Sequence, residues 1–421
     1  MTAIVLALAA AGSWLNARLL KLPVAVGLLV LGLALALAES AALRFAPELG
    51  FGRLFAGIIG QVDYPRLVLQ FMLAYLLFAG ALNVDVAALG RRSLAVGVLA
   101  TLGVIISAAV VAAGFWAVAA FAGRPISPAW ALVFGVLISP TDPVAVLGLT
   151  KRTTLDVDLK AQIEGEALFN DGVAVVLFGA ALAFALGHDG GGADLPGIGL
   201  QVLVEAGGGA LLGLAAGLLS ILVLRAVDDW AAETLATVAL ATGVYTLALH
   251  LDVSAPIAAV AAGLVAGSPP AERAMSESTR RYVHGFWRLI DENMNAVLFL
   301  LLGLELFTVS LDIPVVLTAL AAVPIALAGR WVSVAAPAQA VRLRGRRVRF
   351  TLINLLTWAG VRGGLSVAMA LSLPDRPEKP LIVAAAFAVV IVSMLLQSMT
   401  TEALAVRTGY GQPRGEPEPV S

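Results

Sequence analysis

Long apolar runs recur along almost the whole of this 421-residue chain, and they constrain its fold more than any other feature. A helix needs about 20 apolar residues to cross roughly 30 Å of hydrocarbon, and such runs follow one another from residue 3 to residue 405 with only short polar breaks. Hydrophobic residues make up 60% of the chain and charged residues 13%, which is typical of a protein surrounded by lipid. We therefore predict an all-α polytopic membrane protein.

The apolar runs divide into thirteen predicted spans, which form one transmembrane domain over residues 1–406, followed by a short disordered tail over 407–421. The spans are expected near residues 3–20, 22–39, 66–84, 94–122, 128–148, 161–187, 199–226, 231–249, 253–268, 289–308, 313–341, 350–373 and 380–405. Of the 27 Lys and Arg residues, 19 lie in or beside loops that follow odd-numbered spans or in the tail, and six belong to even-numbered loops. Positively charged loops remain in the cytoplasm, so we predict an inner-membrane protein with its N-terminus outside and its C-terminus inside.

Several classes of function and site are excluded by composition. The net charge of −1 argues against a nucleic-acid partner, and the lack of cysteine excludes disulfides and cysteine-based metal sites. No nucleotide-binding motif is present, and we expect no resident cofactor. The first residues, MTAIVLALAAAGSWLNARLL, lack the basic start of a cleavable signal peptide, so they are expected to form the first span.

Gly209, Gly213 and Gly217 form a stripe of small residues that predicts either a dimer face or packing within one subunit.

Two predicted spans are interrupted. In GVLISPTDPVAVLGL (135–149), Pro140 and Pro143 remove backbone donors, which leaves carbonyl groups without helical partners and should unwind the fifth span. In TWAGVRGGLSVAMAL (357–371), three glycines surround Arg362 in the twelfth span. If spans one to six and eight to thirteen are inverted repeats, the two interruptions are equivalent, and paired interruptions are the usual pointer to the binding site of a transporter.

The stretch EGEALFNDG places carboxylates inside the sixth span. Asp171 is about ten residues into this span, or roughly 15 Å deep, where a charged group is costly and usually functional. Helical geometry puts Glu164 and Asp171 on one face and Glu166 and Asn170 on another. We therefore expect Asp171 to face the unwound fifth span.

Charge balance predicts partners for the remaining buried groups. Arg362 is one of few cations within the spans, so we expect it to pair with Glu166, and we expect Asp142 to lie near Asp171. A purely structural role is the alternative for each of these carboxylates. An intramembrane aspartyl protease with Asp142 and Asp171 as its dyad is a different alternative, although the Gly-x-Gly-Asp pattern of such enzymes is missing. A passive cation channel is a third.

Four motifs, in this order and spacing, carry a resemblance to a known family. SPTDPVAV, EGEALFNDG, LLGLEL and GVRGGLSVAMALSLP resemble the monovalent cation:proton antiporter-1 family, in particular its bacterial NhaP-type branch. The resemblance covers nearly the whole chain except the tail. It implies thirteen helices with inverted repeats, a homodimer in the lipid bilayer, and a core domain that moves against a dimerisation domain.

The resemblance also implies roles for individual residues. The aspartate of the Asn170-Asp171 pair would bind the cation or the proton, and Thr141 and Asp142 would add ligands. The glutamate that matches Glu166 would pair with the arginine that matches Arg362, and Glu164 is a possible secondary site. Two positions depart from the family pattern, because many relatives have Ser where this chain has Ala167, and Glu where it has Ala79. These departures bear on cation selectivity.

The expected mechanism is competition for one site. Burial disfavours the charged form of a carboxylate, whereas either a proton or a bound cation removes that penalty. Oxygen ligands suit a hard monovalent cation such as Na⁺ or Li⁺, and a K⁺/H⁺ antiporter is the alternative. Because Asn170 cannot titrate, we predict that Asp171 alone alternates between a bound proton and a bound cation. The result is an electroneutral exchange of one cation for one proton.

Overall fold

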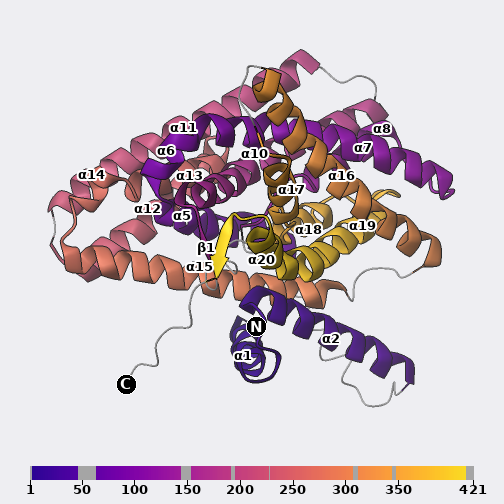
Figure 1. The fold of residues 1–421 in the computed structure, drawn as a ribbon, viewed down its shortest axis with the longest axis horizontal. Coiled ribbons are helices and arrows are strands. Elements are labelled where there is room, and N and C mark those ends of the chain that lie inside the picture. Colours follow the sequence, from indigo (N-terminus) through magenta and orange to yellow (C-terminus); the bar gives the residue numbers. More distant parts are fainter. Residues whose placement is uncertain are drawn as a thin grey trace.

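The structure is a computed structural model that describes residues 2–45, 63–143, 153–190, 195–226, 228–306, 312–343 and 348–413. Its longer helices are α1 (Thr2–Leu15), α2 (Val24–Phe45), α5 (Leu73–Asn83), α6 (Val86–Val98), α7 (Val104–Phe121), α8 (Pro128–Leu137), α10 (Val157–Gly190), α11 (Leu195–Ala226), α12 (Trp230–His250), α13 (Ala255–Ala266), α15 (Glu277–Glu305), α16 (Ile313–Leu343), α17 (Phe350–Ala359), α18 (Gly364–Leu371), α19 (Lys379–Val392) and α20 (Ser398–Arg407) (Figure 1). Two short helices are α4 (Tyr64–Arg66) and α14 (Pro269–Glu272). Wider π-helical turns at Asn16–Leu20, Leu67–Met72, Leu99–Gly103 and Ser393–Gln397 continue or join the longer helices.

The helices confirm the predicted class of fold, an all-α polytopic membrane protein. Eight helices or continuous helical runs in the described residues are long and apolar enough to cross a membrane, and α17 and α18, bent by 53°, form a ninth. The helices α2, α8 and α13 are apolar but shorter, and α15 is long but carries charged residues in its first half. Each of the thirteen predicted spans overlaps one of these elements.

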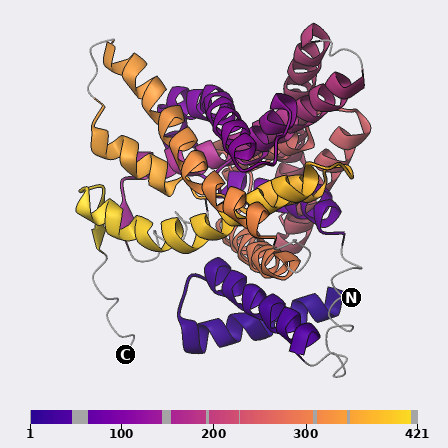
Figure 2. The same cartoon turned by 90° about the vertical axis from the view of Figure 1, so that its right-hand side faces the viewer.

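The helices pack as two groups, which are joined by α10 through its contacts with α11 and α13. In one group, α15 packs along α2 and α5, and α13 packs against α5, α11 and α12. In the other, α7 packs against α8 and α16, α16 against α19, and α10 against α6 and α8. Figures 1 and 2 show α1 and α2 together below α15 at one edge of the molecule. This arrangement leaves α5 and α15 on one side of a central space and α8, α10 and α18 on the other.

The glycine stripe of α11 packs within the subunit. A Cβ added at Gly209 would overlap the carbonyl oxygen of Ser254, the residue before α13, and one added at Gly213 or Gly217 would overlap atoms of α13 itself. The structure therefore supports packing within one subunit, the second of the two predictions for this stripe.

The end of the chain corrects the predicted tail. Strand β2 (Gly411–Pro413) pairs antiparallel with β1 (Thr153–Leu155), so an ordered segment follows α20 inside the range that was expected to be disordered. Tyr410 packs with Leu155 against the apolar cluster beneath this strand pair. The pairing depends on a distant partner strand, which local composition does not show. Residues 414–421 lie outside the described part of the chain.

Candidate ion-binding site

The fifth span unwinds where its prolines predict. Helix α8 ends at Leu137, and Ile138 to Pro143 continue without helical structure. Pro140 has no N–H to donate to the Val136 carbonyl, and the Ser139 N–H donates to that carbonyl instead, at 3.1 Å. The remainder of the predicted interruption, from residue 144 onwards, lies outside the described residues.

The break between α17 and α18 meets this unwound segment. The Asp142 N–H donates to the Val361 carbonyl at 2.7 Å, which joins the two interruptions directly. The Arg362 guanidinium donates to the carbonyls of Ser139 and, at 3.0 Å, of Pro140. A cation beside the carboxyl end of a helix is stabilised by the helix dipole, and here it also bonds to the Ser139 carbonyl, whose helical donor is missing at Pro143. Arg362 therefore holds the crossing of the two broken helices together.

The predicted pair of Glu166 with Arg362 is wrong. The ion-pair partner of Glu166 is Arg330, which lies in the middle of α16, and both side chains are buried. Arg330 also donates to the Leu356 carbonyl at 3.1 Å. Its side chain lies against Gly360, where any Cβ would overlap it. The physical reason for the exchange of partners is that Arg362 is already bonded to the carbonyls of the unwound segment that follows α8.

Asn170 bonds to the unwound backbone. Its side-chain amide donates to the Thr141 hydroxyl at 2.8 Å, and its side-chain carbonyl accepts from the Thr141 N–H at 3.3 Å. Both residues are buried. The amide of Asn170 thus fixes the position of Thr141, while the next residue, Asp171, points elsewhere.

Asp171 and Asp142 line one cavity of about 650 Å³ between the two groups of helices. Both side chains are half-buried, and in the described residues Asp171 has no hydrogen-bond or ion-pair partner. Asp142 lies against Gly363, where a Cβ would coincide with its carboxylate. Glu164 lines the same cavity and pairs with Lys160 at 3.7 Å. The cavity therefore presents an unpaired carboxylate beside the crossing of the broken helices.

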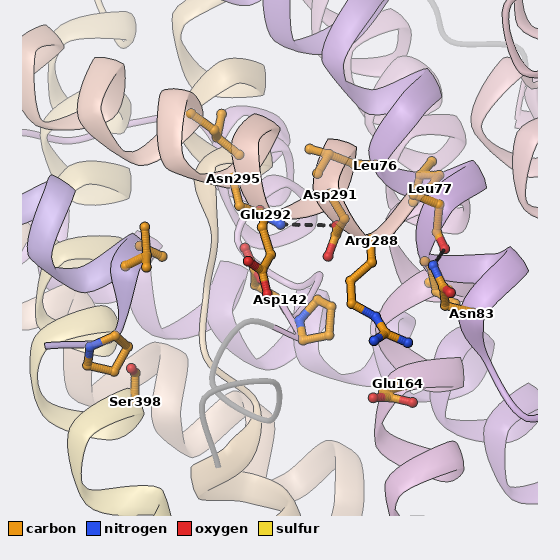
Figure 3. Close-up of a pocket in the computed structure, with 18 of the residues that line it drawn as sticks. Leu76, Leu77, Asn83, Asp142, Glu164, Arg288, Asp291, Glu292, Asn295 and Ser398 are labelled. Atoms are coloured by element: carbon orange, nitrogen blue, oxygen red, sulfur yellow. Dashed lines mark hydrogen bonds between the residues drawn. The ribbon is translucent and has the colours of Figure 1, made fainter. Parts of the chain in front are cut away.

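The opposite wall holds polar residues that the sequence analysis did not assign to the site. Arg288, Asp291, Glu292 and Asn295 line the cavity from α15 (Figure 3), and Asn295 donates to the Asp291 carboxylate at 3.1 Å. The signal was present in RLIDENMN, because charged residues at the start of an apolar span usually face protein or water.

The two departures from the family pattern fall in different places. Ala79 lines the cavity, so the glutamate that many relatives carry there would have faced it. Ala167 is buried and does not belong to the cavity lining. Of the two, only the alanine at position 79 removes a polar group from this wall.

Comparison with known proteins finds matches over nearly the whole chain. The family model described as sodium/hydrogen exchanger, transmembrane, matches residues 4–407. The chain is 40% identical over 408 residues to the Na⁺/H⁺ antiporter NhaP of Pseudomonas aeruginosa, covering 95% of each chain. It is 33% identical over 398 residues to the Na⁺/H⁺ antiporter NhaH of Halobacillus aidingensis, covering 93% of this chain and 94% of that one. Its fold is similar to that of the sodium proton antiporter MjNhaP1 from Methanocaldococcus jannaschii, with a TM-score of 0.71, 19% identity and coverage of 96% and 97%.

Proposed function

The chain belongs to the sodium/hydrogen exchanger family, and on that premise we propose that it exchanges Na⁺, and also Li⁺, for H⁺ through a single shared site at Asp171. The observation that carries the assignment of the site is an unpaired, half-buried carboxylate in a cavity at the crossing of two interrupted helices. The relatives are antiporters, so the chain is a transporter rather than an enzyme. Thr141, Asn170 and Asp142 would complete the site, and no resident cofactor is proposed.

The charges around the crossing support an exchange of one for one. Arg330 and Arg362 contribute two positive charges, and Glu166 and Asp142 contribute two negative charges, so these four side chains balance. Asp171 adds one negative charge without a partner among the described residues. One proton or one monovalent cation would therefore neutralise these five side chains.

This balance suggests how transport is coupled. An unneutralised carboxylate is costly to carry through the hydrocarbon region, so the wall that bears Asp171 should cross between its two positions only when it is loaded. A proton and a metal cation cannot both bind to one carboxylate at the same time, so they compete for it. Exchange follows because the site releases one ion on one side of the membrane and moves back only after it has bound another ion there.

We propose that the cavity opens to the cytoplasm. Its lining includes Asn83 at the end of α5, Lys160 at the start of α10, Arg288 in the first half of α15 and Glu402 near the end of α20. The neighbouring loops are those that positive charge assigns to the cytoplasmic side. The structure would then be the inward-open form of an inner-membrane protein with its N-terminus outside. A homodimer is also proposed, with an interface other than the glycine stripe of α11.

Proteoliposomes that report internal pH test the function against its alternatives. Addition of external Na⁺ or Li⁺ should move protons out of acid-loaded vesicles, and reversal of the proton gradient should reverse the Na⁺ flux. A cation channel would give Na⁺ flux without this dependence on the proton gradient. A stronger response to K⁺ than to Na⁺ would replace the proposed substrate with K⁺.

Membrane voltage is expected to leave the exchange rate unchanged. Asn170 cannot titrate, so Asp171 would exchange one proton for one cation with no net charge movement. A charge that did cross would gain about 2.3 kcal/mol per 100 mV, which would change the rate steeply. The measurement is Na⁺-driven proton flux in proteoliposomes clamped at several potentials with potassium and valinomycin. A flux that rises with potential would show that a second carboxylate cycles protons.

Gly363→Ala is expected to raise the half-saturating Na⁺ concentration by about tenfold, the cost of losing roughly 1.4 kcal/mol of binding free energy. The added Cβ would occupy the position of the Asp142 carboxylate and displace this proposed ligand. Gly179→Ala is the matched control, because a Cβ at Gly179 meets no atom within 4 Å. Equal Na⁺ dependence in the two variants would remove Asp142 from the site.

A further inference from the structure

A second, apolar groove of about 840 Å³ lies between α16, α17 and α20 and shares no lining residue with the ion cavity. Its walls include Leu327 and Trp331 of α16, Asn354 and Trp358 of α17, and Arg407 at the end of α20. The proposed transport mechanism makes no use of it.

The position of the groove indicates that lipid covers it. Trp331 is 40% exposed and Phe350, the first residue of α17, is 54% exposed, and their rings pack edge to face with centroids 6.3 Å apart. The ring of Phe350 belongs to the first turn of α17, and exposed aromatic rings at the ends of spans are typical of the boundary between headgroups and hydrocarbon. The start of α17 and the end of α20 both lie on the proposed cytoplasmic side. The groove therefore runs from the inner headgroup region, at the start of α17 and the end of α20, towards Trp331 and Pro324 near the middle of α16.

One polar side chain in the groove lacks a partner. Asn354 is half-buried, and its amide makes no hydrogen bond within the described part of the chain. The neighbouring Trp358 does have one, because its indole N–H donates to the Thr400 hydroxyl at 2.8 Å. An unsatisfied amide that faces hydrocarbon is costly, so the geometry calls for a ligand with polar atoms at this depth.

The charge at the mouth of the groove selects the class of ligand. Arg407 is exposed, forms no ion pair among the described residues, and is the only charged residue that lines the groove there. In the sequence, five arginines lie at and beyond the end of α16 in RLRGRRVR (342–349), a loop that the charge pattern predicts to be cytoplasmic. Basic residues at the cytoplasmic surface attract anionic lipid headgroups.

We propose that this groove binds an anionic phospholipid of the inner leaflet. Its phosphate would contact Arg407, its glycerol esters would bond to Asn354, and one acyl chain would lie along α16 between Trp331 and Trp358. This proposal rests on the orientation given above, but not on the identity of the transported ion.

Quenching of tryptophan fluorescence by brominated lipid tests the proposal on the full chain in detergent micelles, because two of its seven tryptophans line the groove. Brominated phosphatidylglycerol should quench saturably at a concentration roughly fivefold lower than brominated phosphatidylcholine, which corresponds to about 1 kcal/mol for one arginine. Trp331→Phe combined with Trp358→Phe should remove the saturable component. Arg407→Gln should remove the preference for phosphatidylglycerol, whereas Arg376→Gln, in the loop before α19, should preserve it.

Further variants distinguish binding in this groove from a general attraction of anionic lipid to a basic protein surface. Ala328→Phe places a ring in the groove and should weaken saturable quenching by both lipids by roughly fivefold or more, while Na⁺/H⁺ exchange in proteoliposomes shows that the variant is folded. Full preference for phosphatidylglycerol in Arg407→Gln, an equal loss in Arg376→Gln, or unchanged quenching in Ala328→Phe would each overturn the proposal. None of these outcomes depends on the ion that the protein carries.

Discussion

Asp171→Asn is expected to reduce Na⁺-driven proton exchange to the level of empty liposomes. The substitution keeps the size of the side chain and removes its titratable charge, so the site could hold neither a proton nor a cation by charge neutralisation. The same change should leave folding intact or improve it slightly, because the charge that it removes has no ion-pair partner among the described residues. The measurement is internal pH in proteoliposomes, with thermal unfolding in detergent as the check of folding.

Glu164→Gln is the matched control for this experiment. Glu164 lies on the same helix, seven residues before Asp171, and lines the same cavity, but it is paired with Lys160. We expect this variant to retain exchange with the same dependence on Na⁺. Exchange that persists in Asp171→Asn and disappears in Glu164→Gln would move the transport site to Glu164.

The interruptions of the helices could be predicted because their causes are local. Proline lacks an N–H wherever it stands, so Pro140 and Pro143 end a helix without reference to any other segment. The depth of Asp171 rests on the same kind of local reasoning, from helical rise and the length of the apolar run, and stays a prediction. The sequence therefore predicted both the crossing region and the carboxylate that faces it.

The partners of buried charges could not be predicted in this way. The sequence shows that Arg330 and Arg362 each lie in an apolar span and need acceptors, but it does not show which helices meet. Carbonyl oxygens can also satisfy an arginine, and they become available only where another helix unwinds. The wall of the cavity formed by α15 was missed although its charged residues stand out in the sequence, because the cavity that they line is set by the packing of α15 against α5.

Arg330→Ala is expected to lower the free energy of unfolding by about 3 to 5 kcal/mol, because it leaves the buried carboxylate of Glu166 without its partner. Combining Glu166→Gln with Arg330→Gln should restore most of the loss, since two neutral amides replace two charges. The measurement is unfolding in mixed detergent and SDS micelles, read by tryptophan fluorescence.

A second double-mutant cycle distinguishes the two arginines. Arg362→Gln should also destabilise the protein, by about 1 to 3 kcal/mol for each carbonyl left unsatisfied, so the size of the single effects does not identify the partner of Glu166. The coupling energy identifies that partner. Substitutions of residues in direct contact couple by about 0.5 to 3 kcal/mol, whereas the effects of substitutions at separated residues nearly add. Coupling of Glu166 to Arg330 should be at least twice its coupling to Arg362. A larger coupling of Glu166 to Arg362 than to Arg330 would support the pairing expected from the sequence. Arg330 would then no longer count in the proposed charge balance around Asp171.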